Sequence, residues 1–231
     1  MKPMGREHNK HRRGSVMIEF VLVSGFFWIP LICFLATTGF RLSRSIELVQ
    51  LVNDFSQMFA QGEDFSVAGN QSMVINTMAS TFSLQSNGAN AVTGGGSGNL
   101  AVVLSEYFYV NGSDPSCTSC ANASNVVLER RIILGNQNLI GAKGSPSSVG
   151  TIPSGSLNTT TGTCQTANNN LPPVTTCQYT LTTVRVTTAS FNTIMTNLPT
   201  NAGGNVGGTV YLVEAYFEDL TGAVIYQRSI D

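Results

Sequence analysis

Residues 20–40 read FVLVSGFFWIPLICFLATTGF, a run of 21 residues without a formal charge. As an α-helix, a segment of this length covers about 30 Å, the thickness of the hydrocarbon layer of a bilayer. A cleaved secretory signal would have a shorter apolar core followed by an A-x-A-like site, which is missing here. We therefore expect a retained transmembrane helix over residues 15–40, with a kink where Pro30 interrupts the backbone hydrogen bonds.

The charges on either side of this segment predict its orientation. Five basic residues against Glu7 give residues 1–14 a charge of +4, whereas the rest of the chain carries −5. By the positive-inside rule, residues 1–14 are expected to be a cytoplasmic leader, and the remainder is exported to the periplasm or cell surface. The basic run has no interleaved aromatic residues and leads directly into apolar sequence, so we expect no nucleic-acid partner.

Glu19 interrupts the apolar sequence SVMIEFVLV. A carboxylate at membrane depth costs on the order of 2.5 kcal/mol or more unless a partner compensates it. Glu19 either snorkels toward water at the cytoplasmic interface or is neutralised by a positive group.

The residues around Glu19 resemble the processing site of type IV pilin-like proteins, in which a basic leader ends in Gly and the mature chain has Glu at its fifth position. Here Arg12-Arg13-Gly14 ends the leader, and Glu19 is fifth if Ser15 is first. The longer stretch RGSVMIEFVLVSGFFWIPLI resembles the opening of TadE-like minor pilins of tight-adherence (Tad) pili, although Ile18 replaces a frequent Ala or Val. The matching positions are Gly14, Glu19, Phe20 and Pro30.

This resemblance implies that a prepilin peptidase cleaves the bond between Gly14 and Ser15. It also implies that the Glu19 carboxylate pairs with the new N-terminal amine of a neighbouring subunit during assembly. The expected partners are therefore the membrane, other pilin-like subunits, the pilus assembly machinery and the peptidase. Such pairing is physically coherent, because loss of the leader creates a positive charge for a carboxylate otherwise stranded in lipid.

Past Arg41 the sequence predicts that the helix continues as a stem over residues 41–62. Gly62 is expected to end it in a left-handed conformation. Apolar residues recur at three- and four-residue steps and form one stripe, which packs on the domain of the same chain, on other subunits, or on both. These residues are Leu42, Ile46, Val49, Val52, Phe55 and Phe59.

Residues 63–231 are expected to form an exported α+β domain with an antiparallel sheet and long Gly/Ser/Thr/Asn-rich loops, the longest over residues 141–176. A short helix is predicted over Asn70–Phe82 from its periodicity. Gly222 is expected to close a tight hairpin between the last two strands. The predicted strands are Leu100–Val110, Val126–Leu134, Cys177–Thr188, Thr209–Asp219 and Ala223–Ile230.

Four cysteines, Cys117, Cys120, Cys164 and Cys177, lie in the polar region, and Cys33 lies in the apolar run. An even number of cysteines in an exported domain favours disulfides, with the pairing open. A zinc site or a redox pair is the alternative, and we expect neither a metal nor a cofactor.

Both histidines, His8 and His11, lie in the leader, so the exported part has no histidine for a catalytic triad or metal site. Glu214 and Glu218 share one strand face and could mimic a glycosidase pair, but we interpret them as solvated charges. We therefore expect no enzyme. The sequence predicts a minor pilin-like subunit or assembly component of a Tad-type pilus, serving pilus biogenesis, adhesion or secretion. A single-pass membrane-anchored binding module outside any pilus is the rival hypothesis.

Overall fold

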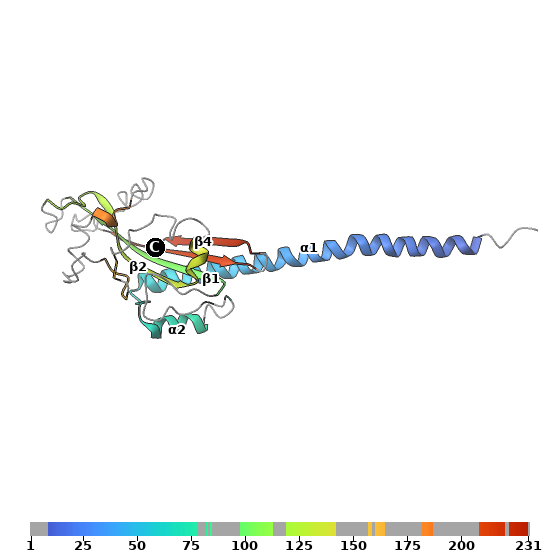
Figure 1. Cartoon of the computed structure of the whole chain (residues 1–231), viewed down its shortest axis with the longest axis horizontal. Coiled ribbons are helices and arrows are strands. Elements are labelled where there is room, and N and C mark those ends of the chain that lie inside the picture. Colours follow the sequence, from blue (N-terminus) through green and yellow to red (C-terminus); the bar gives the residue numbers. More distant parts are fainter. Residues whose placement is uncertain are drawn as a thin grey trace, which may run out of the picture. The chain divides into compact units, whose positions relative to one another are not determined.

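A computed structural model of the chain describes residues 9–77, 82, 84, 98–112, 119–141, 157–158, 160–164, 182–186, 208–219 and 222–230. These residues form an α+β structure, with a long N-terminal helix and a four-stranded antiparallel sheet (Figure 1). The chain divides into two compact units, Met1–Ile46 and Glu47–Asp231.

Helix α1 spans Asn9–Ala60 and contains the whole apolar run, with Pro30 inside it. It ends as predicted, because Gly62 has a φ of 89° and its amide bonds the carbonyl oxygen of Phe59 at 3.0 Å. The helix begins earlier than Ser15, since a single glycine such as Gly14 costs a helix only about 1 kcal/mol. The kink at Pro30 stays a prediction.

The sheet has the strand order β2-β1-β3-β4, and every neighbouring pair is antiparallel. The central strand β1 pairs with β2, which follows it, and with β3, which comes near the end of the chain. Four of the five predicted strands are confirmed to within two residues. Their bounds are Leu100–Val110 for β1, Asn125–Gly135 for β2, Thr209–Glu218 for β3 and Val224–Ile230 for β4.

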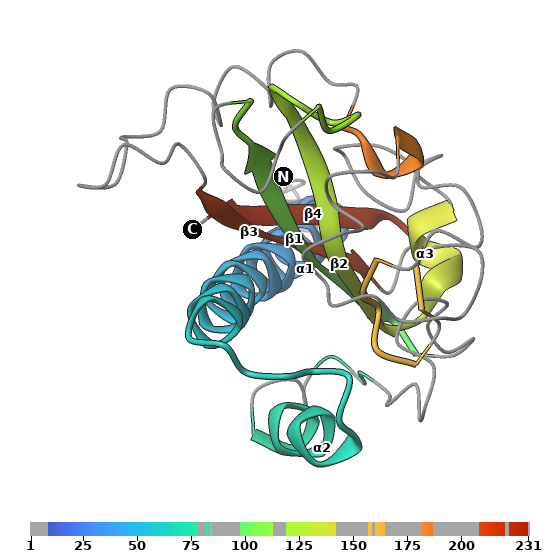
Figure 2. The same ribbon diagram turned by 90° about the vertical axis from the view of Figure 1, so that its left-hand side faces the viewer.

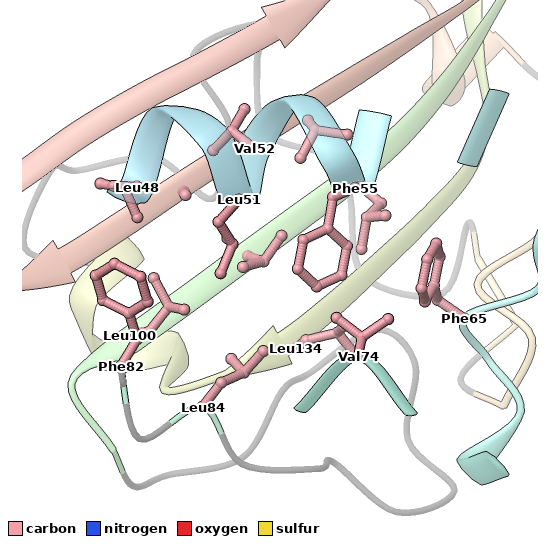
Figure 3. Close-up of a cluster of buried hydrophobic side chains, with 14 of the residues drawn as sticks. Leu48, Leu51, Val52, Phe55, Phe65, Val74, Phe82, Leu84, Leu100 and Leu134 are labelled. Carbon is pink, nitrogen blue, oxygen red and sulfur yellow. The ribbon is translucent and has the colours of Figure 1, made fainter. Parts of the chain in front are cut away.

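One face of the sheet is covered by the C-terminal end of α1. Leu48, Leu51, Val52, Phe55 and Phe59 of this helix are all buried. Figure 3 shows several of them gathered in one cluster with side chains from β1, β2 and helix α2. The spacing of three and four residues puts them on one side of the helix, and burial of each such side chain contributes about 1.5–3 kcal/mol.

The opposite face of the sheet packs against α3, which spans Gln137–Gly141 (Figure 2). Leu139 and Ile140 of this helix are buried with Val103, Ile133 and Tyr216 from three strands. Side chains alternate between the two faces of the sheet along β1, and both faces are buried. This strand is therefore apolar at nearly every position.

Only part of the predicted stripe on the stem packs on the domain of the same chain. Val52, Phe55 and Phe59 are buried as expected, but Leu42 and Ile46 are 63% and 52% exposed. Leu48 and Leu51, which the stripe left out, are buried instead. Contact with the sheet begins only at Leu48, so the face that packs on the domain is shifted from the one predicted.

Two other elements differ from prediction. The described part of the predicted strand Cys177–Thr188 is a 3₁₀ turn, η2, at Thr182–Val184, followed by an isolated bridge from Arg185 to Val127. Within residues 182–186 the chain therefore makes one turn and one bridge, and no longer strand. Helix α2 spans Ala68–Thr77, earlier than predicted, and Met73 is exposed whereas Val74 is buried.

The hairpin between β3 and β4 closes as predicted. Gly222 has a φ of 77° and its amide bonds the carbonyl oxygen of Asp219 at 3.0 Å. The amide of Ala223 bonds an Asp219 carboxylate oxygen at 3.0 Å. The left-handed conformation at Gly222 is what permits this short connection.

Gly135 and Gly222 form a matched pair for testing the packing between β1 and β2. Both have positive φ, so alanine at either costs roughly 1–2 kcal/mol from the backbone alone. A Cβ on Gly135 would also lie 2.2 Å from the carbonyl oxygen of Leu100, whereas one on Gly222 meets nothing closer than 3.9 Å. We expect Gly135→Ala to lower the free energy of unfolding by about 3 kcal/mol or more. Denaturant unfolding of the two variants in detergent should separate them, and equal losses would contradict this packing.

A second pair tests which face of α1 packs on the sheet. We expect Phe55→Ala to cost about 3–5 kcal/mol, because the side chain is fully buried. Val49→Ala on the same helix removes a side chain that is 40% exposed and should cost less than about 1 kcal/mol. The same unfolding measurement applies, and a large loss with Val49→Ala would show that the helix packs through a different face.

Candidate functional site: the apolar part of helix α1

The segment of α1 before residue 41 exposes its apolar side chains on all sides. Phe20, Val23, Phe26 and Phe40 are each 69–88% exposed, and Trp28 is 55% exposed. A helix that is apolar around its whole circumference must be covered by lipid or by other protein. One helix of this chain, counted over the described residues, is thus long and apolar enough to cross a membrane.

The two threonine hydroxyl groups in this segment are satisfied within the helix. Thr37 Oγ1 donates to the carbonyl oxygens of Cys33 and Phe34, at 2.9 and 3.0 Å, and Thr38 Oγ1 donates to that of Phe34 at 2.8 Å. These two hydroxyl groups therefore need no water, which suits a segment surrounded by hydrocarbon.

The residues of the predicted processing site all lie in helical backbone. Gly14 and Ser15 fall in the first turns of α1, and Glu19 follows one turn later with an exposed side chain. Met17, Ile18 and Phe20 beside it are 64–74% exposed. Glu19 is therefore placed within an apolar surface. The cleavage of the Gly14–Ser15 bond and the pairing of Glu19 between subunits stay predictions.

The cysteines of the polar region lie far along the chain from this segment. Cys120 and Cys164 are both disulfide-bonded, whereas Cys117 and Cys177 lie outside the described residues. Cys164 is buried in the cluster around Tyr107 and Leu128, and Cys120 packs at the edge of that cluster. Within the part of the chain that the structure describes, no group of three or more His, Cys, Asp or Glu side chains could hold a metal ion.

The prediction that Glu214 is a solvated charge is wrong. Glu214 is fully buried on β3, and its carboxylate accepts a hydrogen bond from the hydroxyl of Tyr226 at 2.8 Å. The structure leaves Glu218, at the end of the same strand, only half-buried. Sequence spacing placed the two carboxylates on one face correctly, but it could not show that α3 and the neighbouring strands bury that face.

A buried arginine lies on the same face of the sheet. Arg131 is only 3% exposed, and it donates from Nε to Ser105 Oγ at 3.1 Å and from Nη2 to the Tyr107 hydroxyl at 2.9 Å. A buried guanidinium needs such partners, because an unsatisfied charge in the interior is very costly. These bonds join β1 to β2 and suit a structural role.

A second ionisable cluster, which the sequence analysis missed, lies at the opposite face beside the end of α1. Arg130 of β2 forms an ion pair with Asp64, which follows α1, and its Nε bonds the carbonyl oxygen of Thr161 at 3.3 Å. Asp64 Oδ1 also accepts from the amide and hydroxyl of Ser66, at 2.9 and 2.7 Å. Although burial raises the pKa of Asp64, the bonds from Ser66 and the charge of Arg130 lower it overall.

Glu106 and Tyr211 complete this cluster from β1 and β3. They are register partners, and the phenol of Tyr211 lies close enough to the Glu106 carboxylate to act on its pKa. Burial raises the pKa of Glu106, although the charge of Arg130 acts to lower it. Burial also raises the pKa of Tyr211, and the charges of Glu106 and Glu129 raise it further. Tyr211 in turn packs edge-on against Phe59, the last buried residue of α1, at 5.1 Å between ring centroids.

The apolar segment can be tested by placing one charge in it. We expect Ile29→Arg to weaken membrane integration, because an arginine at the centre of a membrane helix costs about 2.5–3.5 kcal/mol on insertion scales. Val49→Arg introduces the same charge on the same helix outside residues 20–40, and it should leave integration unchanged. Alkaline extraction of membranes reports the difference. Equal retention of both variants would show that residues 20–40 are not the integrating segment.

No protein-family model matches this sequence, no curated protein matches it, and no solved structure matches the fold. The function of this chain is therefore inferred from its own residues and geometry.

Proposed function

We propose that this protein is a minor pilin-like subunit or assembly component of a Tad-type pilus. It is anchored in the bacterial inner membrane by the apolar part of α1, with its N-terminus cytoplasmic and residues 63–231 exported. The observation that carries the proposal is the division of α1 into two kinds of surface. Most side chains over residues 16–40 are apolar and exposed, whereas the buried ones from Leu48 to Phe59 pack on a sheet.

This division is what a filament subunit requires. The first part of the helix can lie in lipid before assembly and against neighbouring subunits afterwards, because both surroundings are apolar. The second part belongs to the core of the folded domain and stays there in either state. Leu42 and Ile46, exposed between the two parts, supply further apolar surface for a neighbour.

The position of Glu19 supports the same proposal. Its exposed carboxylate lies among exposed apolar side chains, and a charge in such surroundings is costly in lipid. Cleavage between Gly14 and Ser15 would remove the basic leader and create an amine one helical turn away. That amine, on a neighbouring subunit, is a partner of opposite charge that becomes accessible when subunits pack together.

We further propose that the protein is not an enzyme and that it needs no cofactor. No histidine occurs after His11, and the buried carboxylate of Glu214 is engaged by Tyr226. Both the Glu214 and the Arg131 hydrogen bonds join neighbouring strands, which is a structural use of these groups.

The N-terminal residue of the membrane-extracted protein tests the processing step. We expect mature protein that begins at Ser15, and we expect Gly14→Val to leave the leader attached because a larger side chain blocks the peptidase. Gly39→Val is a matched control, since a Cβ there has nothing within 4 Å and the site is outside the leader. An intact Met1 in the natural protein would instead favour the rival hypothesis, a membrane-anchored module that binds ligands through its loops.

Glu19→Gln tests assembly separately from processing. We expect this variant to be cleaved normally but to enter filaments at least tenfold less, because the amide cannot neutralise a neighbouring amine. Glu47→Gln makes the same exchange on the same helix beyond the apolar segment and should assemble normally. The measurement is the amount of the subunit in sheared pilus fractions. Incorporation of Glu19→Gln at the natural level would contradict the proposed pairing.

A further inference from the structure

Pro30 deprives one carbonyl group in the apolar part of α1 of its usual hydrogen bond. Proline has no backbone N–H, and Pro30 lies inside the helix. The carbonyl oxygen of Phe26, four residues earlier, therefore lacks the donor that it would have in an uninterrupted helix. Phe26 is 88% exposed, and Pro30 is exposed as well. In hydrocarbon no water replaces the missing donor, so this acceptor is left in costly surroundings.

Trp28 brings a donor without a partner to the same part of the helix. The indole has a single polar group, an N–H that can only donate. Among the described residues its ring packs edge-on against Phe27, at 5.9 Å between ring centroids, and no group accepts from the N–H. Tryptophan is enriched at the two membrane surfaces, where the polar end of its ring meets water, but Trp28 lies near the middle of residues 20–40.

This donor and this acceptor cannot meet on one helix. With 3.6 residues per turn, positions two apart are separated by about 200° around the axis, so Trp28 and Phe26 lie on nearly opposite sides of α1. Along the axis they are only about 3 Å apart. Copies inserted side by side with the same topology therefore hold the Trp28 indole of one level with the Phe26 carbonyl of the next.

The Trp28 side of the helix also allows a neighbour to come close. Ser24 and Gly25 precede Trp28 by four and three positions, so they lie on the same side. A Cβ on Gly25 would have nothing within 4 Å. Small residues of this kind let the backbones of two membrane helices approach each other. A carbonyl group of a neighbouring helix can therefore reach the indole.

We propose that the membrane segments of neighbouring copies of this chain associate through a hydrogen bond from Trp28 Nε1 of one copy to the Phe26 carbonyl oxygen of the next. Because the two groups lie on opposite sides, each helix donates on one side and accepts on the other. Such a head-to-tail contact is not closed by a two-fold axis, so it extends beyond a dimer. The contact rests on the membrane position proposed above for residues 20–40, but not on a role in a pilus.

Cys33 is a natural probe of this arrangement. It is exposed and has a free thiol, and it follows Phe26 by seven positions, close to two full turns, so it lies on the accepting side of α1. Leu35 follows Trp28 by seven positions and lies on the donating side. The head-to-tail contact therefore places Cys33 of one copy beside Leu35 of the next, whereas two Cys33 thiols stay apart.

Oxidative cross-linking of the full chain, in membranes of a host without pilus genes, tests the arrangement. With copper phenanthroline we expect Leu35→Cys to give a ladder of dimers, trimers and larger species that Cys33→Ser removes. The natural chain should give no product through Cys33. Phe34→Cys is a matched control, because position 34 lies between the two contacting sides. Equal ladders from Phe34→Cys and Leu35→Cys, or dimers of the natural chain that Cys33→Ser removes, would overturn the proposal.

Two variants in the Leu35→Cys background test the hydrogen bond itself. Trp28→Phe keeps an aromatic ring but removes the donor, and Pro30→Ala restores the amide that Phe26 lacks within its own helix. Each should lower the cross-linked fraction about three- to tenfold, in line with hydrogen bonds between membrane helices. The double variant should be no lower, because both changes remove the same bond. Additive losses, or unchanged cross-linking with Trp28→Phe because the indole bonds Ser24 of its own helix, would contradict the contact.

Membrane retention separates a failure of this contact from a failure of the proposed function. All these variants should resist alkaline extraction, because none of them introduces a charge into the segment. A retained chain that forms no ladder overturns the association of copies and leaves the membrane position intact. A chain that is extracted contradicts the membrane position of residues 20–40, and the contact fails with it.

Discussion

The packing of the last turns of α1 on the sheet is the contact on which the rest of the domain depends. Phe55 and Phe59 lie over β1 and β3, and the cluster they form also holds Val74 and Phe82. Without the helix, the apolar face of the sheet would be open to water. Before residue 41 the same helix is apolar around its whole circumference. One continuous helix therefore has apolar side chains on all sides in its first half and a single buried apolar face in its second.

Much of this architecture could be predicted from the sequence, because the elements are long and their patterns are strong. Residues 20–40 have no charge, and the runs that became β1 and β2 are rich in β-branched residues, so their type and bounds were clear. The stem was harder. Its apolar residues occur on more than one side of the helix, and only contact with the sheet selects Leu48 and Leu51 over Leu42 and Ile46.

The polar clusters could not be predicted, for a different reason. Asp64, Glu106, Arg130 and Tyr211 come from four separate segments and meet only through the strand register and the end of α1. The bulge in β2, where Glu129 has no register partner on β1, falls within three consecutive charged residues, and the sequence does not indicate which of the three is the extra one. The run Cys177–Thr188 shows the opposite error: it has strand composition, yet its described part forms one bridge and a 3₁₀ turn.

The central place of β1 also determines when the domain can fold. Leu104 pairs with Ile132, which lies 28 positions later, and with Val213, which lies 109 positions later. The hairpin of β1 and β2 can close early, but the second edge of β1 has no strand until nearly the whole chain has emerged. Closing so long a loop slows folding, and an open edge invites pairing with other chains. During synthesis, therefore, the domain is exposed to aggregation until its final two strands arrive.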